Sequence, residues 1–321
     1  MRHGAKRGDM SFHRFFFKAI DHIYEPFQNR RRCTKFGGVQ FDIARDIVYD
    51  NAFPDVCRLD VCRLKREGKA VGPDINGSPV VLYFHGGGFA AGDKHCRRAL
   101  ARWLAVNGYA VVNVNYGLAP KYKFPSQHRH IVSVFGWLQN NAQKYGLDIG
   151  RAVFAGDSAG AYYAAMLACL CVRPDLARKL GTAVNFRPRG VILNCGVYDM
   201  PSLATDKMLF NLGKYIFRDI TGMQRPHADG YMWGELLSIP ALVTPDFPPA
   251  LLIYASRDTL CGRQHEGMIA ALHNNNVPLT VYAAQSKRYD HCFSLMWKGE
   301  AAEQANAHIL SFLSERLGTS R

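Results

Sequence analysis

The chain has 321 residues, of which 48% are hydrophobic, and a formal net charge of +14. This length is enough for one large α/β domain or two medium ones with a sizeable core. The longest apolar run, residues 162–172, is far short of the roughly 20 residues that a membrane-spanning helix needs, so stable membrane insertion is excluded.

The N-terminal residues indicate the cellular location, and the spacing of the cysteines indicates whether a metal is bound. Residues 1–9 are basic, but no apolar segment with a small-residue cleavage site follows them, so the prediction is a cytoplasmic protein. The nine cysteines lack a C-x-x-C pair, which predicts free thiols and no bound metal. The basic residues form no stripe with stacking aromatics, which argues against nucleic acid. Attraction to acidic substrates or to anionic lipid headgroups stays open, and so does a homodimer.

Helical and strand patterns alternate along most of the chain. Residues 10–27 read as a helix that Pro26 is expected to end. Two strands around 39–49 and 56–64 follow, and then a polar loop over 65–78. Further strands are predicted at 80–84, 109–114, 152–155, 191–195, 251–255 and 279–283. The helices between and after them are predicted at 93–106, 126–145, 161–172, 263–273 and 301–317. The pattern predicts a mostly parallel eight-stranded sheet with helices on both faces.

Residues 199–247 interrupt this rhythm, because they contain no strand pattern and many large apolar side chains. The segment predicts a helical insert on the active-site side of the sheet. Together with residues 1–36 it would form a lid on a single domain that spans 1–321.

The pentapeptide Gly156-Asp157-Ser158-Ala159-Gly160 lies between the strand at 152–155 and the helix at 161–172. A strand that turns into a helix through Gly-x-Ser-x-Gly is typical of the nucleophile elbow of α/β-hydrolases. The turn would hold Ser158 Oγ exposed at the carboxyl edge of the sheet. The helix N-terminus beneath it would favour developing negative charge.

A serine nucleophile needs a base and an acid, each on a loop after a strand. The loop after 251–255 offers Asp258, and the loop after 279–283 offers His291. Asp290 is a weaker acid candidate because adjacent side chains rarely meet. Asp246 precedes its strand and would lie at the wrong edge of the sheet.

The oxyanion of such a reaction needs hydrogen-bond donors. His85-Gly86-Gly87-Gly88 directly follows the strand at 80–84, where such a motif completes an oxyanion hole. The predicted donors are the N–H groups of Gly87, Gly88 and Ala159. A phosphate-binding loop would need a Gly-Lys-Ser/Thr continuation, which this chain lacks.

Taken together, these motifs resemble the hormone-sensitive-lipase-like branch of the α/β-hydrolases, which includes bacterial carboxylesterases and arylacetamide deacetylase. The resemblance rests on His85-Gly86-Gly87-Gly88-Phe89, on the pentapeptide around Ser158, and on Tyr116-Gly117-Leu118-Ala119-Pro120 with Phe124-Pro125. It implies serine ester hydrolysis beneath a two-part lid. Three departures from the family pattern are expected to border the site: Asp93, Tyr162 and Cys292.

The predicted function is a serine hydrolase that acts on short- to medium-chain acyl esters through Ser158, His291 and Asp258, without metal or organic cofactor. The predicted partner is therefore a small-molecule ester. An amide substrate would use the same machinery and stays open. A ligand-binding receptor on this fold is the third hypothesis, although it should have lost the base. The acyl pocket is expected to be shortened by bulky side chains: Phe15, Phe16, Phe210, Phe217, Trp233 and Tyr162.

Overall fold

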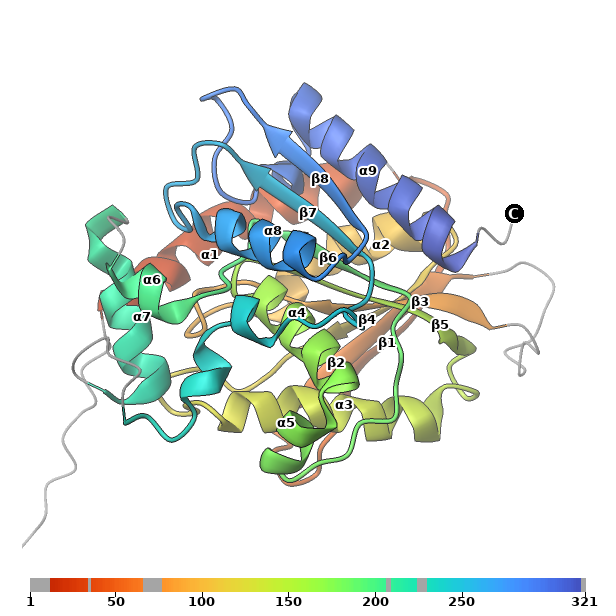
Figure 1. Ribbon diagram of the computed structural model, residues 1–321. Helices are drawn as coiled ribbons and strands as arrows, with labels where there is room; N and C mark the ends of the chain where they lie inside the picture. Colours follow the sequence, from red (N-terminus) through yellow and green to blue (C-terminus); the bar gives the residue numbers. More distant parts are fainter. Residues whose placement is uncertain (1–11, 34–35, 66–76, 206–208, 224–229, 319–321) are drawn as a thin grey trace, which may run out of the picture.

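A single eight-stranded sheet runs through the computed structural model (Figure 1), which describes residues 12–33, 36–65, 77–205, 209–223 and 230–318. The sheet order is β1-β2-β4-β3-β5-β6-β7-β8. The strands are β1 (Phe41–Val48), β2 (Arg58–Leu64), β3 (Ser78–Phe84), β4 (Ala110–Val114), β5 (Leu147–Asp157), β6 (Gly190–Asn194), β7 (Ala250–Ala255) and β8 (Leu279–Ala284). The predicted strand number and mostly parallel character are confirmed.

Strand direction determines which loops meet. The six strands β4, β3, β5, β6, β7 and β8 pair in parallel with one another, whereas β2 is antiparallel to both β1 and β4. The carboxyl ends of β3, β5, β7 and β8 therefore lie at one edge of the sheet. In α/β sheets that edge is where ligands bind.

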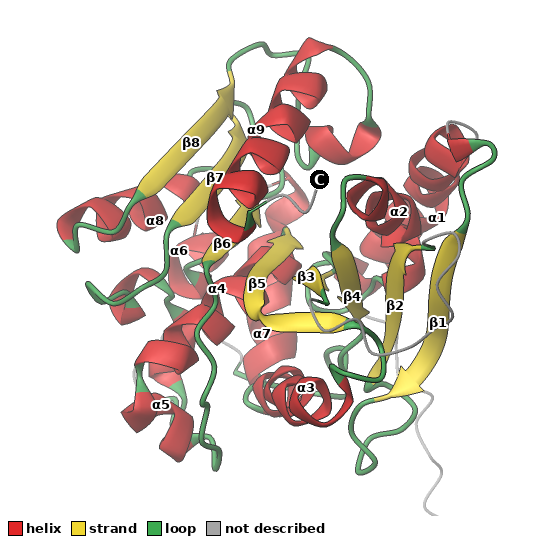
Figure 2. Cartoon of the chain, turned by 90° about the vertical axis from the view of Figure 1, so that its right-hand side faces the viewer, coloured by secondary structure: helices red, strands yellow, loops and turns green. Residues whose placement is uncertain are grey.

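Helices cover both faces of the sheet (Figure 2). On one face α2 (Arg98–Val106) and α9 (Glu300–Leu317) pack on alternate strand residues such as Val81, Val111 and Val153. On the other face lie α3 (Ser126–Asn141), α4 (Ala159–Val172) and α8 (Gln264–Asn274). A 3-10 turn (Lys94–Arg97) precedes α2, and the short α5 (Pro174–Lys179) follows α4 without having been predicted.

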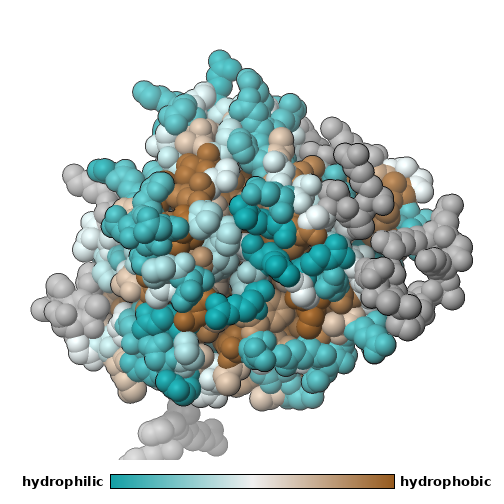
Figure 3. All heavy atoms as spheres, turned by 45° about the vertical axis from the view of Figure 1, so that its right-hand side comes forward, coloured by the Kyte–Doolittle hydropathy of each residue, from teal (hydrophilic) through white to brown (hydrophobic). Residues whose placement is uncertain are grey.

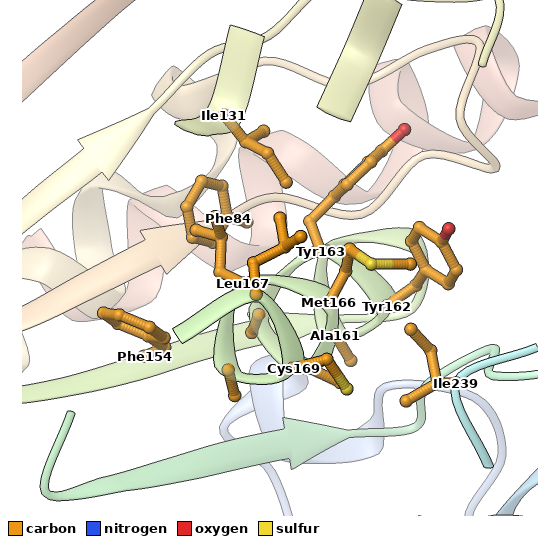
Figure 4. Close-up of a cluster of buried hydrophobic side chains, with 14 of the residues drawn as sticks. Phe84, Ile131, Phe154, Ala161, Tyr162, Tyr163, Met166, Leu167, Cys169 and Ile239 are labelled. Carbon is orange, nitrogen blue, oxygen red and sulfur yellow. The ribbon is translucent and has the colours of Figure 1, made fainter. Parts of the chain in front are cut away.

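The α4 helix is the centre of the larger core. Its residues from Ala159 to Cys171 are all buried, which explains why the helix is apolar on every side. Figure 4 shows Phe84, Ile131 and Phe154 gathered around its Met166 and Leu167. A helix buried in this way holds its N-terminus, and with it the residue before it, in a defined position.

The N-terminal helix α1 (Phe12–Cys33) is longer than predicted, because Pro26 lies inside it and does not end it. Proline removes one backbone hydrogen bond in a helix interior, and here its ring is exposed. The helix lies against the 3-10 turn Lys94–Arg97, α2 and α7. The predicted lid residues 1–11 and 34–35 lie outside the described residues, as does most of the loop predicted at 65–78.

The segment 199–247 is helical in its described part, as predicted. It contains α6 (Met200–Thr205), α7 (Leu212–Thr221) and the 3-10 turns Leu209–Asn211, Gly234–Leu237 and Pro240–Leu242. Its described residues make one isolated β-bridge, between Asp199 and Ser238. Residues 206–208 and 224–229 lie outside the description.

The surface and the helix lengths bear on membranes. Among the described helices, none is both long and apolar enough to span a bilayer. On the face drawn in Figure 3, hydrophobic residues form separate patches divided by hydrophilic ones.

Candidate active site

Ser158 lies at the tip of a strained turn between β5 and α4. Its backbone has φ 53° and ψ −122°, an unusual conformation for a residue with a side chain, and its N–H bonds the Asn194 carbonyl oxygen at 2.9 Å. A side chain at position 156 would collide with the Gly160 backbone, and one at 160 with that of Phe84. Both glycines are therefore needed for this turn. Ser158 is only 7% exposed, so the prediction of an exposed serine is wrong.

The loop after β3 supplies backbone donors near the turn. Gly87 and Gly88 have φ of 129° and 58°, the left-handed region that favours glycine. Within the described chain, the N–H groups of Gly87, Gly88 and Ala159 bond no protein acceptor. The Phe17 ring of α1 lies against Gly88, where any side chain would collide with it. Of these three residues, Gly87 also lines the cavity described below.

Asp258 and His291 meet across the loops after β7 and β8. Nδ1 of His291 lies 2.9 Å from Asp258 Oδ2 and 3.0 Å from Oδ1. Asp258 Oδ1 also accepts the N–H groups of Leu260 at 3.0 Å and Cys261 at 2.7 Å. These contacts fix the carboxylate in one orientation against the imidazole.

Charge and burial act in opposite directions on this pair. Burial lowers the pKa of His291, but the Asp258 carboxylate outweighs it and raises that pKa well above the usual value. Burial likewise raises the pKa of Asp258, whereas the charge of His291 and its hydrogen bond lower it below the usual value. The pair therefore favours an ionised carboxylate beside the imidazole.

The other two carboxylates weighed from the sequence, Asp290 and Asp246, make other contacts. Asp290 is exposed and accepts the N–H groups of Thr259 at 2.8 Å and His291 at 2.7 Å, so it caps the loop and does not touch the imidazole ring. Asp246 is exposed and precedes β7, at the opposite edge of the sheet from Ser158.

A cavity of about 950 Å³ brings the predicted residues together. Ser158, His291 and Gly87 line it, whereas Asp258 lies behind His291. Apolar side chains of α1 line the same cavity: Phe16, Phe17, Ile20 and Ile23. This volume suits a small organic molecule.

Two of the three departures expected at the site lie outside the cavity. Tyr162 is fully buried, and its hydroxyl donates to the Leu236 carbonyl oxygen and lies 2.7 Å from His128 Nε2. Asp93 caps the turn before α2 by accepting the His95 N–H at 2.8 Å. Only Cys292 lines the cavity. The expectation that Tyr162 shortens the pocket is therefore wrong, and so is the expected position of Asp93.

Cys292 contacts a second thiol that the sequence did not connect with it, Cys195 at the end of β6. A hydrogen bond with Cys195 lowers the pKa of Cys292 to about 7, with a further contribution from His291 and against the effect of burial. Nothing in the chain order suggested this contact.

A buried ion pair beneath the serine was also not predicted. Asp157 is 1% exposed, and its carboxylate accepts Nε of Arg97 at 2.8 Å and Nη2 at 2.6 Å. Tyr83 Oη donates to the same carboxylate at 2.8 Å, and the Gly86 N–H at 3.2 Å. The pair therefore links the elbow to the loop that carries the backbone donors.

Arg97→Met should lower the free energy of unfolding by about 3–5 kcal/mol, because the buried Asp157 charge would lose its partner. Urea unfolding measures the change. Arg263→Met is the matched control: its pair with Glu266 is exposed, so the expected change is below about 1 kcal/mol. Equal effects of the two substitutions would contradict the prediction.

One group of side chains of the kinds that bind metals, Glu25, His95 and Cys96, has its ligand atoms within 4.8 Å of one another. A hydrogen bond with Asp93 raises the pKa of His95 to about 11. Both ring nitrogens of His95 are already paired, Nδ1 with Asp93 Oδ1 at 2.6 Å and Nε2 with Glu25 Oε2 at 3.2 Å, so this group is an ion-pair network and not a candidate metal site.

The fold and this geometry define a class. A serine on a strand–turn–helix elbow, a histidine–carboxylate pair after later strands and a glycine-rich donor loop are the features of an α/β-hydrolase. Residues 81–295 match the family model described as the alpha/beta hydrolase fold. The chain belongs to this family, in the hormone-sensitive-lipase-like branch that its motifs predicted.

Known relatives agree with this membership. The chain is 31% identical to esterase LipI of Mycobacterium tuberculosis over 227 residues, which are 67% of this chain and 66% of that protein. It is 36% identical to arylacetamide deacetylase of Bos taurus over 163 residues, which are 49% of this chain and 38% of that one. The matched segments thus span less than two thirds of either relative.

Solved structures share the fold. Esterase B of Lactobacillus rhamnosis superposes with a TM-score of 0.74 at 21% identity, covering 94% of this chain and 95% of that one. A bacterial heroin esterase superposes with a TM-score of 0.69 at 20% identity, covering 95% of this chain and 90% of that one.

Proposed function

We propose that the protein is a serine carboxylic ester hydrolase with Ser158 as nucleophile, His291 as base and Asp258 as the acid. The observation that carries the proposal is the 2.9 Å contact between His291 Nδ1 and Asp258 Oδ2, where His291 lines the same cavity as Ser158 and Asp258 lies behind it. This contact leaves Nε2 of His291 to receive a proton.

In the proposed reaction Ser158 Oγ attacks the ester carbonyl carbon while His291 Nε2 takes the hydroxyl proton. Asp258 holds the imidazole in orientation and stabilises its positive charge. His291 then returns the proton to the leaving alcohol, and an acyl-enzyme remains. Water, activated by the same histidine, cleaves the acyl-enzyme in a second addition step.

Both steps create an oxyanion, which the N–H groups of Gly87, Gly88 and Ala159 would stabilise. Two observations support this role: none of these N–H groups is hydrogen-bonded within the described chain, and Gly87 and Gly88 have positive φ angles. The N-terminus of α4 adds a favourable dipole at the same place. Preorganised donors of this kind are usually worth about 10²–10³-fold in kcat each.

A fluorophosphonate probe tests the proposal directly, since it modifies an activated serine covalently. We expect one label per chain, located on Ser158 by peptide mass spectrometry, and no label on Ser158→Ala. Failure to label the folded protein would overturn the assignment and would favour the ligand-binding receptor.

We further propose that α1 and the insert 199–247 act as a lid of this single domain. The support is that Phe16, Phe17, Ile20 and Ile23 of α1 line the cavity, while α1 also packs on α7. Of the other bulky residues expected there, Phe217 is buried outside the cavity and Phe210 is exposed beside Phe16. On this basis α1, more than the insert, bounds the acyl pocket.

Activity on p-nitrophenyl esters should be highest between acetyl and hexanoyl chains. Each methylene that enters an apolar pocket gains about 0.8 kcal/mol, roughly fourfold in kcat/KM, until the pocket ends. Because the Phe17 ring lies against Gly88, Phe17→Ala should move the optimum to longer chains. A profile of kcat/KM from acetate to dodecanoate measures this.

Phe15→Ala provides the matched control, because Phe15 belongs to the same helix but is 58% exposed. Its chain-length profile should be unchanged. A profile of the unmodified protein that rises steadily to dodecanoate would contradict the short pocket. An unchanged optimum in Phe17→Ala would show that Phe17 does not bound it.

An amide substrate remains the second candidate, favoured by the similarity to arylacetamide deacetylase. Turnover of paired esters and amides with the same acyl group separates the two. The cytoplasmic location and the homodimer considered from the sequence stay predictions.

A further inference from the structure

Three thiols surround His291, although they come from three separate loops. Cys195 directly follows β6, Cys261 follows β7 and Cys292 is the next residue after His291. The Sγ atoms of Cys195 and Cys292 and a ring nitrogen of His291 all lie within 4.8 Å of one another. Among the described cysteines, Cys292 is the one that is not fully buried.

This set has the chemistry and nearly the dimensions of a zinc site. Zinc bonds thiolate sulfur at about 2.3 Å and imidazole nitrogen at about 2.0–2.1 Å, so ligand atoms in a tetrahedral site lie roughly 3.3–3.8 Å apart. The observed limit of 4.8 Å leaves about 1 Å to close. Rotation of the Cys292 side chain, which lies on the cavity wall, supplies movement of that size.

We propose that Cys195, Cys292 and His291 form an inhibitory site for a thiophilic divalent cation, with Zn²⁺ as the representative. The cation would enter through the cavity, which His291 and Cys292 line. Each metal–sulfur bond forms as a thiol releases its proton to solvent, and the histidine donates a lone pair. Water from the cavity would supply the fourth ligand.

Such a cation would stop hydrolysis by occupying the histidine. Bonded at Nε2, it removes the lone pair that takes the serine proton, while Asp258 still orients the ring through its contact with Nδ1. Bonded at Nδ1, it displaces Asp258. The inhibition therefore rests on the proposed role of His291, whereas binding of the cation does not.

Cys261 provides an internal comparison. With Asp258 and His291 it forms another group of ligand atoms within 4.8 Å. However, Asp258 is already engaged by His291 and by two backbone N–H groups, and the Cys261 thiol is buried with its Sγ 3.4 Å from the Cys195 carbonyl oxygen. His291 belongs to both groups, but Cys195 and Cys292 add two thiols that do not contact Asp258, which makes theirs the better zinc set.

The test is a titration of chelator-treated Ser158→Ala protein with Co²⁺, followed by displacement with Zn²⁺. Sulfur-to-cobalt charge-transfer absorbance reports thiolate ligation without any need for activity. We expect stoichiometric absorbance that Cys292→Ser and Cys195→Ser each weaken by at least about tenfold in affinity. Cys261→Ser and the distant Cys57→Ser should bind like the parent.

A parallel assay on the protein with Ser158 intact should show inhibition by Zn²⁺ that EDTA reverses, with each variant compared with its own uninhibited rate. No charge-transfer absorbance would overturn the site. If Cys261→Ser weakened Co²⁺ binding as much as Cys195→Ser does, the proposed choice of ligands would be wrong. Binding without inhibition would refute the inhibitory role alone.

If Cys195→Ser fails to fold, Cys292→Ser, on the cavity wall, decides the ligand assignment.

Discussion

Ser158→Ala and His291→Ala should each lower kcat on p-nitrophenyl butyrate by about 10⁴–10⁶-fold. Ser158 can attack only while its hydroxyl proton is transferred to His291, so loss of either side chain disables the other as well. The double variant should be scarcely slower than the single ones, because residues that act as a unit are strongly non-additive.

Folding must be unchanged for this result to report chemistry. Ser158 is small and makes no capping hydrogen bond through its side chain, so circular dichroism and the urea midpoint should match those of the parent. Ser311→Ala and His273→Ala, both exposed and on helices, are the matched controls and should keep full activity. If Ser158→Ala retained a tenth of the parent activity, the nucleophile would be another residue.

Asp258→Asn should lower kcat by about 10⁴-fold. An amide nitrogen in place of a carboxylate oxygen would donate a hydrogen bond to Nδ1 and favour the tautomer that protonates Nε2. That nitrogen could then no longer accept the serine proton. The remaining amide oxygen can still accept the N–H groups of Leu260 and Cys261, so the loop should stay in place.

Two neighbouring carboxylates control for the charge change. Asp290→Asn removes a charge next in sequence to His291 but keeps an acceptor for the Thr259 and His291 N–H groups. Asp246→Asn removes an exposed charge at the far edge of the sheet. Both should lower kcat far less than Asp258→Asn, and a larger effect of Asp290→Asn would reverse the choice of acid.

The sequence by itself determined the order of elements and the edge where the chemistry gathers. Short apolar runs typical of buried strands alternate along the chain with stretches of helical periodicity. This alternation indicates a parallel α/β sheet, so the eight strands were predictable. Ser158, Asp258 and His291 each follow a strand of one parallel sheet. Parallel strands end at one edge, which is why their convergence could be foreseen without coordinates.

Where local residue preferences and tertiary contacts compete, the tertiary contacts determine the length of a helix and the direction of a side chain. Pro26 is a helix terminator by its chemistry, yet α1 continues to Cys33. Tyr162 was expected in the pocket because it lies four residues after Ser158. Its direction is instead determined by the buried helix that carries it, which turns it toward His128 and Leu236.

Only the tertiary structure decided which distant side chains meet around the nucleophile. Arg97 and Asp157 are 60 residues apart, and Cys195 meets Cys292 from the loop after another strand. Phe17 reaches Gly88 from a helix outside the sheet. Such contacts depend on packing between elements, and no periodic pattern in the sequence indicates which residue packs against which across the core. Sequence periodicity records which face of an element is buried, whereas the partner on that face is selected by the shape of the whole fold.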